Sequence, residues 1–270
     1  MDRLAMLNPG ASRTRLREWI AAGRVRVNGE PARRADLAVA PHDRVTLGPP
    51  APPPFPAPLR RVHEDEDLIV VDKPPGLLTI ADAREHERTA YRLLARYLGG
   101  GRRAPLFIVH RLDRETSGLL VFAKSAAAKH ALQAQFAARA VERVYVAVVE
   151  GGVASEAGVI EIRLAEGRDL RVRRTHDPRR GREAITRFRV LERRRASTVL
   201  ELALETGRRG QIRASLAAQG HPIVGDRRYG AGADPIGRLC LHAVRLGFVH
   251  PRNHRVVLFT SDVPAAFARA

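Results

Sequence analysis

Apolar and polar positions near the amino terminus first follow a helical period and then alternate. Apolar residues recur at helical spacing behind a serine suited to the N-cap, and a glycine follows them. An alternating stretch then indicates a half-buried strand, and an Asn-Gly pair is typical of a two-residue hairpin turn. The predicted elements are a helix between Ser12 and Gly23, a strand at 24–27, a turn at Asn28-Gly29 and a strand at 43–47.

Beyond residue 60, short β-rich runs outnumber helical ones. Strands are expected at 68–71, 119–122, 143–149, 159–164, 185–191, 198–204, 239–248 and 255–259. Helical periodicity occurs at 89–98, 125–138 and 211–219. Because strands and helices do not alternate strictly, this pattern predicts an α+β fold with a mainly antiparallel mixed sheet.

A run of prolines between residues 49 and 58 separates the two patterns. Proline fixes φ and removes a backbone N–H donor, so such a run forms an extended, semi-rigid spacer. The sequence therefore predicts a small αβ domain at 1–48, a linker at 49–60 and a larger domain at 61–270.

The charge of the chain favours a polyanionic partner. Its 270 residues include 47 basic and 29 acidic ones, which gives a net charge of +18. Nearly all basic residues are arginines, whose planar guanidinium binds phosphate and stacks on bases. An arginine-biased genome would explain arginine in place of lysine, but not the excess of basic over acidic residues.

Other features of the sequence exclude several classes of site. With Cys240 as the one cysteine, neither a disulfide within the chain nor a cysteine-based zinc site is possible. No apolar run approaches the ~18 residues of a membrane span, and the first residues lack a signal-peptide pattern. His250 and His254 have helix-like metal spacing, but Pro251 interrupts a helix there and we expect no carboxylate cluster beside them. We therefore expect a monomeric cytoplasmic protein without metal, cofactor or membrane contact.

Asp113 lies on a short loop between two apolar runs and is followed by Thr116-Ser117-Gly118. A carboxylate on such a loop is held rigidly, as a nucleophile or base must be. Arg111 and Arg114 on either side would keep it ionised. An aspartate that caps a turn and pairs with a neighbouring arginine would give the same pattern, and the loop taken alone favours that role.

Segment 110–118, His-Arg-Leu-Asp-Arg-Glu-Thr-Ser-Gly, resembles the signature of the RluA-type pseudouridine synthases. Further segments resemble that family in content and order from about residue 62 to the end of the chain: 64–76, 143–151, 206–213, 220–226, 241–243 and 250–251. The first module resembles an S4 RNA-binding domain through Ser12-Arg13-x-x-Leu16 and residues 23–29.

The resemblance implies an enzyme that isomerises uridine to pseudouridine in structured RNA, expected to be 23S ribosomal RNA, on a base flipped out of its stack. Asp113 would be the essential nucleophile or base. Tyr145 would pack on the uracil, and Arg213 would pair with Asp113 and keep it charged.

Further contacts with substrate or RNA are expected at Arg111, His110, Lys73, Arg208, Ile212, Leu241, Arg13 and Arg24. Arg111 would fill the gap left by the flipped base, or contact phosphate only. Lys73 would contact the substrate or form a structural ion pair. Core packing is the favoured role of Ile212 and Leu241.

The chain departs from the resemblance at Gly210 and Ser215, where the family commonly has histidine. This puts RNA contacts near helix 211–219 in doubt and suggests, as an alternative, a non-catalytic RNA-binding or ribosome-assembly factor. A nuclease or glycosidase would require a metal cluster or a second catalytic carboxylate, and no comparable motif supplies either.

Overall fold

The computed structural model describes residues 1–48, 54–99, 104–167 and 171–270. The chain divides into two compact units, Met1–Pro54 and Phe55–Ala270. The predicted linker at 49–60 is therefore too long at its carboxyl end, because Phe55 packs edge-on against Tyr97 and Leu59 is buried in the core of the second unit. Residues 49–53 of that linker lie outside the described residues.

The first unit is a three-stranded antiparallel sheet with two helices. The sequence pattern predicted its second helix, its first and third strands and the hairpin turn, but not its first helix or its second strand. The sheet has the order β2-β1-β3. Ser12 caps the second helix by accepting a hydrogen bond from the Arg15 amide, and Asn28 and Gly29 take positive φ in the hairpin turn. The elements are α1 (Asp2–Leu7), which was not predicted, α2 (Arg13–Ala21), β1 (Val25–Val27), β2 (Glu30–Pro31) and β3 (Val45–Leu47).

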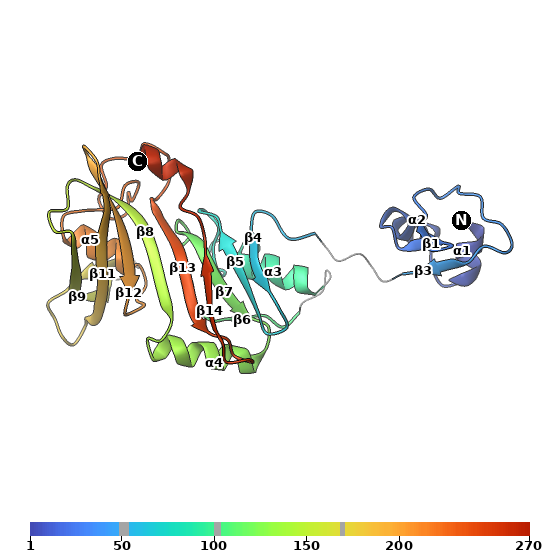
Figure 1. Ribbon diagram of the computed structural model, residues 1–270, viewed down its shortest axis with the longest axis horizontal. Coiled ribbons are helices and arrows are strands. Elements are labelled where there is room, and N and C mark those ends of the chain that lie inside the picture. The colour runs from blue at the N-terminus through green and yellow to red at the C-terminus, as the bar shows by residue number, and fades with distance from the viewer. Residues whose placement is uncertain (49–53, 100–103, 168–170) are drawn as a thin grey trace. The chain divides into compact units, whose positions relative to one another are not determined.

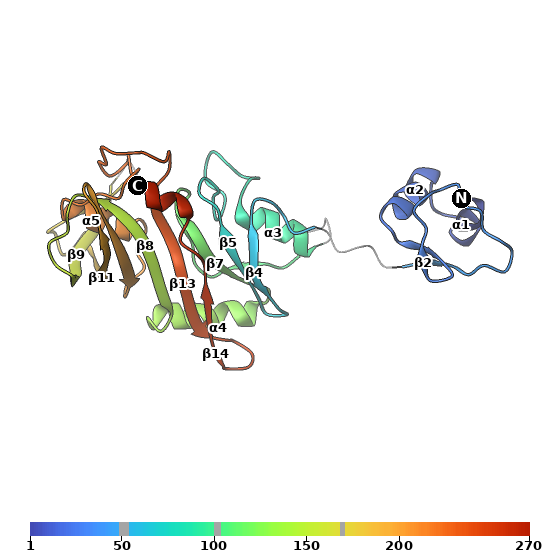
Figure 2. The ribbon, with the colours of Figure 1, turned by 45° about the horizontal axis from the view of Figure 1, so that its top comes forward.

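The second unit is built on an 11-stranded sheet, which Figures 1 and 2 show from two sides. Its main path runs β10-β9-β11-β12-β8-β13-β7-β5-β4, with β14 on β13 and β6 on β7. Every pair is antiparallel except β13 with β7, so the prediction of a mainly antiparallel mixed sheet is confirmed.

The elements of the second unit are β4 (Arg60–Glu64), β5 (Leu68–Lys73), α3 (Ala90–Leu98), β6 (Phe107–Ile108), β7 (Ser117–Ala123), α4 (Ala126–Ala137), β8 (Glu142–Glu150), β9 (Ala157–Glu166), β10 (Val172–Arg174), β11 (Arg182–Arg193), β12 (Ser197–Leu204), α5 (Gln211–Ala218), β13 (Leu241–Val249), β14 (Val256–Thr260) and the 3-10 helix η1 (Ala265–Arg269).

Helices cover both faces of the sheet. Leu132 of α4 is buried against β7 and β13, and in both views α4 lies across one end of these central strands. Ile212 and Leu216 of α5 belong to the other core cluster, with β8 and β12. Within the described ranges, no helix has both the length and the apolar character needed to cross a bilayer.

The parallel contact between β7 and β13 joins the two halves of the sheet. Gly118 has a φ of +111°, and a Cβ there would lie 2.3 Å from the carbonyl oxygen of Ala243. Only glycine permits this approach, because any side chain would push the two strands apart. The contact fixes the start of β7, and with it the loop that carries Asp113, one strand away from β8.

Candidate active site

A cavity of about 520 Å³ brings together segments that are far apart in the sequence. It lies between the loop before β7, the start of β8, the end of β12 and the start of α5. Its walls include Asp113, Tyr145 and Arg213 as well as the predicted contact residues Arg111, His110, Arg208, Ile212 and Leu241. A cavity of this size accommodates a nucleoside.

Backbone contacts hold the residues on both sides of Asp113. The Thr79 hydroxyl donates to the carbonyl of Leu112 at 2.8 Å, and the Leu112 amide donates back to Thr79 at 3.2 Å. The carbonyl of Arg114 accepts the Gly76 amide at 2.8 Å. Asp113, with 23% of its side chain exposed, is thus presented to the cavity from a fixed loop.

Lys73 supports this loop from beneath and does not face the cavity. Its side chain is fully buried, and its ammonium donates to the carbonyls of Pro74, Leu77 and Arg114 at 2.8–3.2 Å. Burial lowers the pKa of Lys73 to about 7, although the charge of Asp113 opposes the shift. The predicted substrate contact at Lys73 is therefore wrong, because all three of its donors are bound to backbone carbonyls. The alternative prediction, a structural ion pair, is also wrong, because the partners of the ammonium are carbonyl oxygens and not carboxylates.

Arg213 connects Asp113 to a buried carboxylate that the sequence analysis did not single out. Its Nε and Nη2 donate to Asp226 at 2.7 and 2.8 Å, and its Nη1 lies 3.4 Å from Asp113 and 3.3 Å from Glu115. Burial opposes the charge of Arg213, but the carboxylates, Asp226 above all, outweigh it and raise the Arg213 pKa. The signal for Asp226 was its place in the matching segment 220–226.

Tyr145 is a neutral phenol at the cavity wall. It is only 8% exposed, and burial raises its pKa to about 12, with Arg143 opposing the shift and Asp113 adding to it. The hydroxyl therefore keeps its proton throughout the neutral range.

His110 is also neutral. Its Nε2 accepts the Val121 amide at 3.2 Å, and its ring stacks on Phe136 with the centroids 4.8 Å apart. Burial, helped by the charge of Arg143, lowers the His110 pKa to about 3. Since Nε2 is the acceptor, the single ring proton resides on Nδ1.

Gly210 and Ser215, where the chain departs from the family pattern, have different positions in the structure. Gly210 precedes α5 with a φ of +57°, so it occupies the N-cap and carries none of the cost of a glycine inside a helix. Ser215 is fully buried, and its hydroxyl has no partner among the described residues. Position 215 therefore lies in the core here, and the expected effect of Ser215 on RNA contacts is wrong.

Arg13 and Arg24 lie in the first unit. Arg13 is exposed at the start of α2. Arg24 donates to the carbonyl of Gly48 and its guanidinium stacks over Trp19, 5.1 Å from the ring centroid. Their role in RNA binding stays a prediction.

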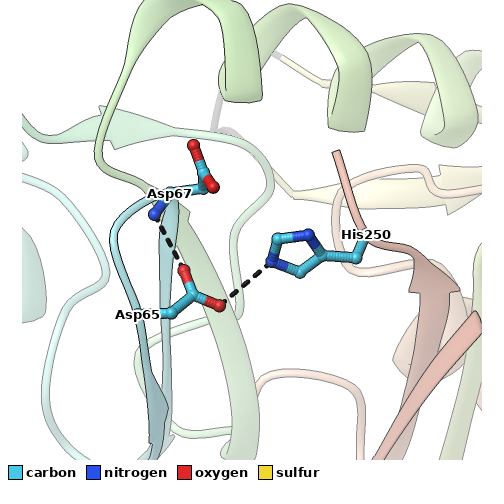
Figure 3. Close-up of side chains that lie close together, drawn as sticks. All are labelled: Asp65, Asp67 and His250. Atoms are coloured by element: carbon cyan, nitrogen blue, oxygen red, sulfur yellow. Dashed lines mark hydrogen bonds and ion pairs between the residues drawn. The ribbon is translucent and has the colours of Figure 1, made fainter. Parts of the chain in front are cut away.

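Asp65, Asp67 and His250 form a cluster of possible metal ligands (Figure 3). The expectation that no carboxylate cluster accompanies His250 is wrong, because the two aspartates come from a segment about 185 residues earlier in the chain. Their atoms already have partners. His250 Nδ1 accepts the Arg252 amide while Nε2 lies 3.0 Å from Asp65, and Arg252 binds the carboxylate of Asp67.

Hydrogen bonds explain the charge at the centre of that cluster. Burial alone would raise the pKa of Asp65, but hydrogen bonds from His63, two backbone amides and His250 lower it to about 2. The cluster thus ties the β4–β5 turn to the end of β13, which is a structural role.

The arrangement around the cavity suits acid–base or nucleophilic chemistry on a nucleotide. It holds a carboxylate beside a fixed guanidinium, a phenol that can donate or accept a hydrogen bond, and several arginines that attract an anion.

Both units of the chain are similar to known proteins. Residues 67–218 match the model of the RNA pseudouridylate synthase family, and residues 1–45 match the S4 domain. The chain is 37% identical to ribosomal large subunit pseudouridine synthase D of Neisseria meningitidis serogroup A, over 97% of this chain and 74% of that protein. It is 36% identical to the uncharacterized RNA pseudouridine synthase YlyB of Bacillus subtilis, over 95% and 88% of the two chains.

Solved structures show the same fold. Human RNA pseudouridylate synthase domain containing 4 superposes with a TM-score of 0.64 at 27% identity, over 78% of this chain and 90% of that one. The family match covers more than half of the chain and includes the loop of Asp113, the strand of Tyr145 and the helix of Arg213. The chain belongs to the RNA pseudouridylate synthase family and carries an S4 domain at its amino terminus.

Proposed function

We propose that this pseudouridine synthase acts on 23S ribosomal RNA and that Asp113, Tyr145 and Arg213 are its catalytic residues. One observation carries the assignment of the residues: Arg213, fixed by buried Asp226, places Nη1 3.4 Å from Asp113 inside the cavity. The choice of RNA is supported by relatives named ribosomal large subunit pseudouridine synthase D.

The reaction breaks the bond between N1 of uracil and C1′ of ribose, turns the base and joins C5 to C1′. C5 loses its proton and N1 gains one, directly or by exchange with solvent. Asp113 acts as nucleophile or base beside the junction of ribose and base. Arg213 keeps Asp113 ionised, and Tyr145 packs on the uracil and holds a proton within the site. Ile212 and Leu241 line the base pocket, and His110 supports its wall.

The target uridine must leave its stack, since Asp113 lies within the cavity. Exposed Arg111 is placed to fill the gap left by the base, and Arg208 borders the same cavity. Arg13 and Arg24 of the S4 domain bind the surrounding RNA. The enzyme works as a monomer in the cytoplasm, without a metal or cofactor.

Pseudouridine mapping tests the function and its substrate together. Ribosomal RNA from cells that lack the protein is compared with RNA from the parent strain, and we expect at least one pseudouridine of 23S RNA to disappear. Purified protein should restore it on unmodified RNA without added metal or cofactor. If no site disappears and none is restored, the protein is an RNA-binding factor instead.

The Asp113→Asn variant tests the catalytic assignment. It should abolish conversion and leave RNA binding within about twofold of the parent protein. Glu161→Gln, which removes an exposed carboxylate from β9, is the matched control and should keep full activity. Full activity of the Asp113→Asn variant would contradict the assignment.

A further inference from the structure

Arg143 lies on β8 two residues before Tyr145 and lines the same cavity. Residues two apart on a strand face the same side, about 7 Å from each other. Arg143 is only 9% exposed. Its Nη2 donates to the carbonyls of Leu204 and Glu205 at 3.2 and 3.3 Å, and its guanidinium lies over the ring of Phe136.

The charge of this buried guanidinium is unmatched. Among the residues that the structure describes, no carboxylate forms an ion pair with Arg143, and its buried Nε has no hydrogen-bond partner. The nearby Glu205 carboxylate pairs with Arg187 instead. Arg213 shows the contrast, since three carboxylates surround it. Because an unpaired buried cation is costly, Arg143 is suited to receive an anion.

Gly207 lets this guanidinium lie close against the backbone of the turn after β12. A Cβ at position 207 would lie 2.5 Å from Nη1 of Arg143. The φ of Gly207 is not positive, so the close approach of Arg143 is the reason the structure shows for a glycine here. The end of β12 and the Gly207 turn thus hold the charged group in place at the wall of the cavity.

We propose that Arg143 binds a backbone phosphate of the flipped nucleotide or of its immediate neighbour. This rests on the proposed function. Uracil and ribose are neutral, so phosphate is the one anionic group that the RNA can bring into the cavity. The spacing fits one nucleotide, with the base at Tyr145 and a phosphate one step along β8. A guanidinium also offers the forked donors that phosphate oxygens accept.

A chemical double-mutant cycle tests the proposal. The substrate is a synthetic fragment of 23S RNA that carries the uridine found by mapping, with a neutral methylphosphonate placed at one linkage at a time around that uridine. With the parent enzyme, one such replacement should lower kcat/KM by about 10- to 100-fold, the effect of losing a hydrogen bond between charged groups. The Arg143→Met variant should already show this lower kcat/KM on unmodified RNA. The methylphosphonate that affects the parent enzyme should lower the kcat/KM of this variant by no more than about a further twofold.

Two further variants separate phosphate binding from support of the fold. Arg143→Lys keeps a charge and should remain sensitive to the same methylphosphonate. Gly207→Ala displaces the flexible end of Arg143, so it should lower sensitivity at that linkage while the thermal midpoint stays within about 2 °C. Arg193→Met is the matched control, because Arg193 also donates to backbone carbonyls but has its own carboxylate in Glu156 and lies outside the cavity. It should respond like the parent enzyme.

The proposal is overturned if the losses from Arg143→Met and from every methylphosphonate multiply, because independent effects mean that Arg143 touches none of these phosphates. It is also overturned if Arg143→Lys loses as much as Arg143→Met and is equally sensitive at all linkages. If mapping yields no target uridine, the proposed function fails instead. In that case, inorganic phosphate binding to the parent protein and to Arg143→Met, measured by calorimetry, decides the phosphate site.

Discussion

Arg213 binds the buried Asp226 through Nε and Nη2 and directs its remaining nitrogen, Nη1, towards Asp113. One guanidinium thus binds a buried carboxylate on one side and faces the carboxylates of Asp113 and Glu115 on the other. Because Asp226 is fully buried, the bidentate pair fixes the plane of the guanidinium before any RNA is bound.

We expect Asp226→Asn to reduce both stability and turnover. The change leaves a buried guanidinium without its main partner, which costs about 3 kcal/mol and lowers the melting midpoint by roughly 6–12 °C. Single-turnover kcat should fall more than RNA affinity, since Arg213 no longer holds its orientation. Calorimetry and stopped-time conversion assays measure the two effects.

Asp234→Asn provides the comparison for Asp226. Asp234 pairs with Arg227, which is 83% exposed, so this pair contributes little to stability. Equal effects of the two substitutions would show that Asp226 has no special role.

Gly118→Ala should destabilise the second unit by several kcal/mol and abolish activity. The new Cβ would lie 2.3 Å from a backbone oxygen of β13, which cannot move aside as a flexible side chain can, and the positive φ adds strain. Denaturant unfolding and conversion assays check this. Gly152→Ala has open space around it and should change neither. A Gly118→Ala variant as stable as the parent would contradict the close packing of β7 on β13.

Ser215→Ala should stabilise the protein by about 1 kcal/mol. The hydroxyl of Ser215 is buried and has no partner in the described part of the chain, so its removal relieves a desolvation cost. Urea unfolding measures the change. Ser197→Ala is the control with the opposite expected result. The Ser197 hydroxyl donates to the carbonyl of Ala270, so its removal should lower the stability of the protein. A loss in both variants would mean that Ser215 has a partner after all.

His110 should make stability depend on pH below neutrality. Its pKa in the folded protein is about 3, below the ~6.5 of an exposed histidine, so the unfolded chain binds more protons between these values. Stability is therefore full above pH 6.5 and falls as the pH decreases, by about 1 kcal/mol at pH 5 for this half-buried ring. Unfolding midpoints of the parent protein and of His110→Gln, compared from pH 8 to pH 4.5, should reveal that difference. His130→Gln, at an exposed histidine of α4, should follow the parent curve.

Periodicity predicted most of the fold because the long strands and helices carry their own pattern. It missed α1 and β4, and also β2, β6, β10 and η1, which are short or lack a regular apolar period. The linker was drawn too long because prolines mark a spacer without showing that Phe55 and Leu59 pack against distant residues.

The sequence pointed to some residues of the site and missed or misjudged others. Motif resemblance pointed to Asp113, Tyr145 and Arg213, and the fold brings all three to one cavity. Lys73 was misjudged, because no local pattern shows that an ammonium will be surrounded by three carbonyls. Arg143 and Asp226 were missed as well, because their importance depends on which distant groups do or do not reach them.

The position of β13 between β7 and β8 has a consequence for the time at which the enzyme becomes active. Asp113 lies just before β7, whereas Tyr145 is on β8 and Arg213 is on α5, which contacts β9, β10 and β11 of the same half of the sheet. The strand Leu241–Val249 therefore holds the two sides together. A chain emerging from the ribosome possesses Asp113, Tyr145 and Arg213 by residue 213, yet lacks the strand that joins the two halves of the sheet. Synthesis must proceed past residue 249 before the halves of the sheet can close, and such non-local closure is a slow event in folding. The cavity between the two halves therefore cannot form until β13 has been synthesised.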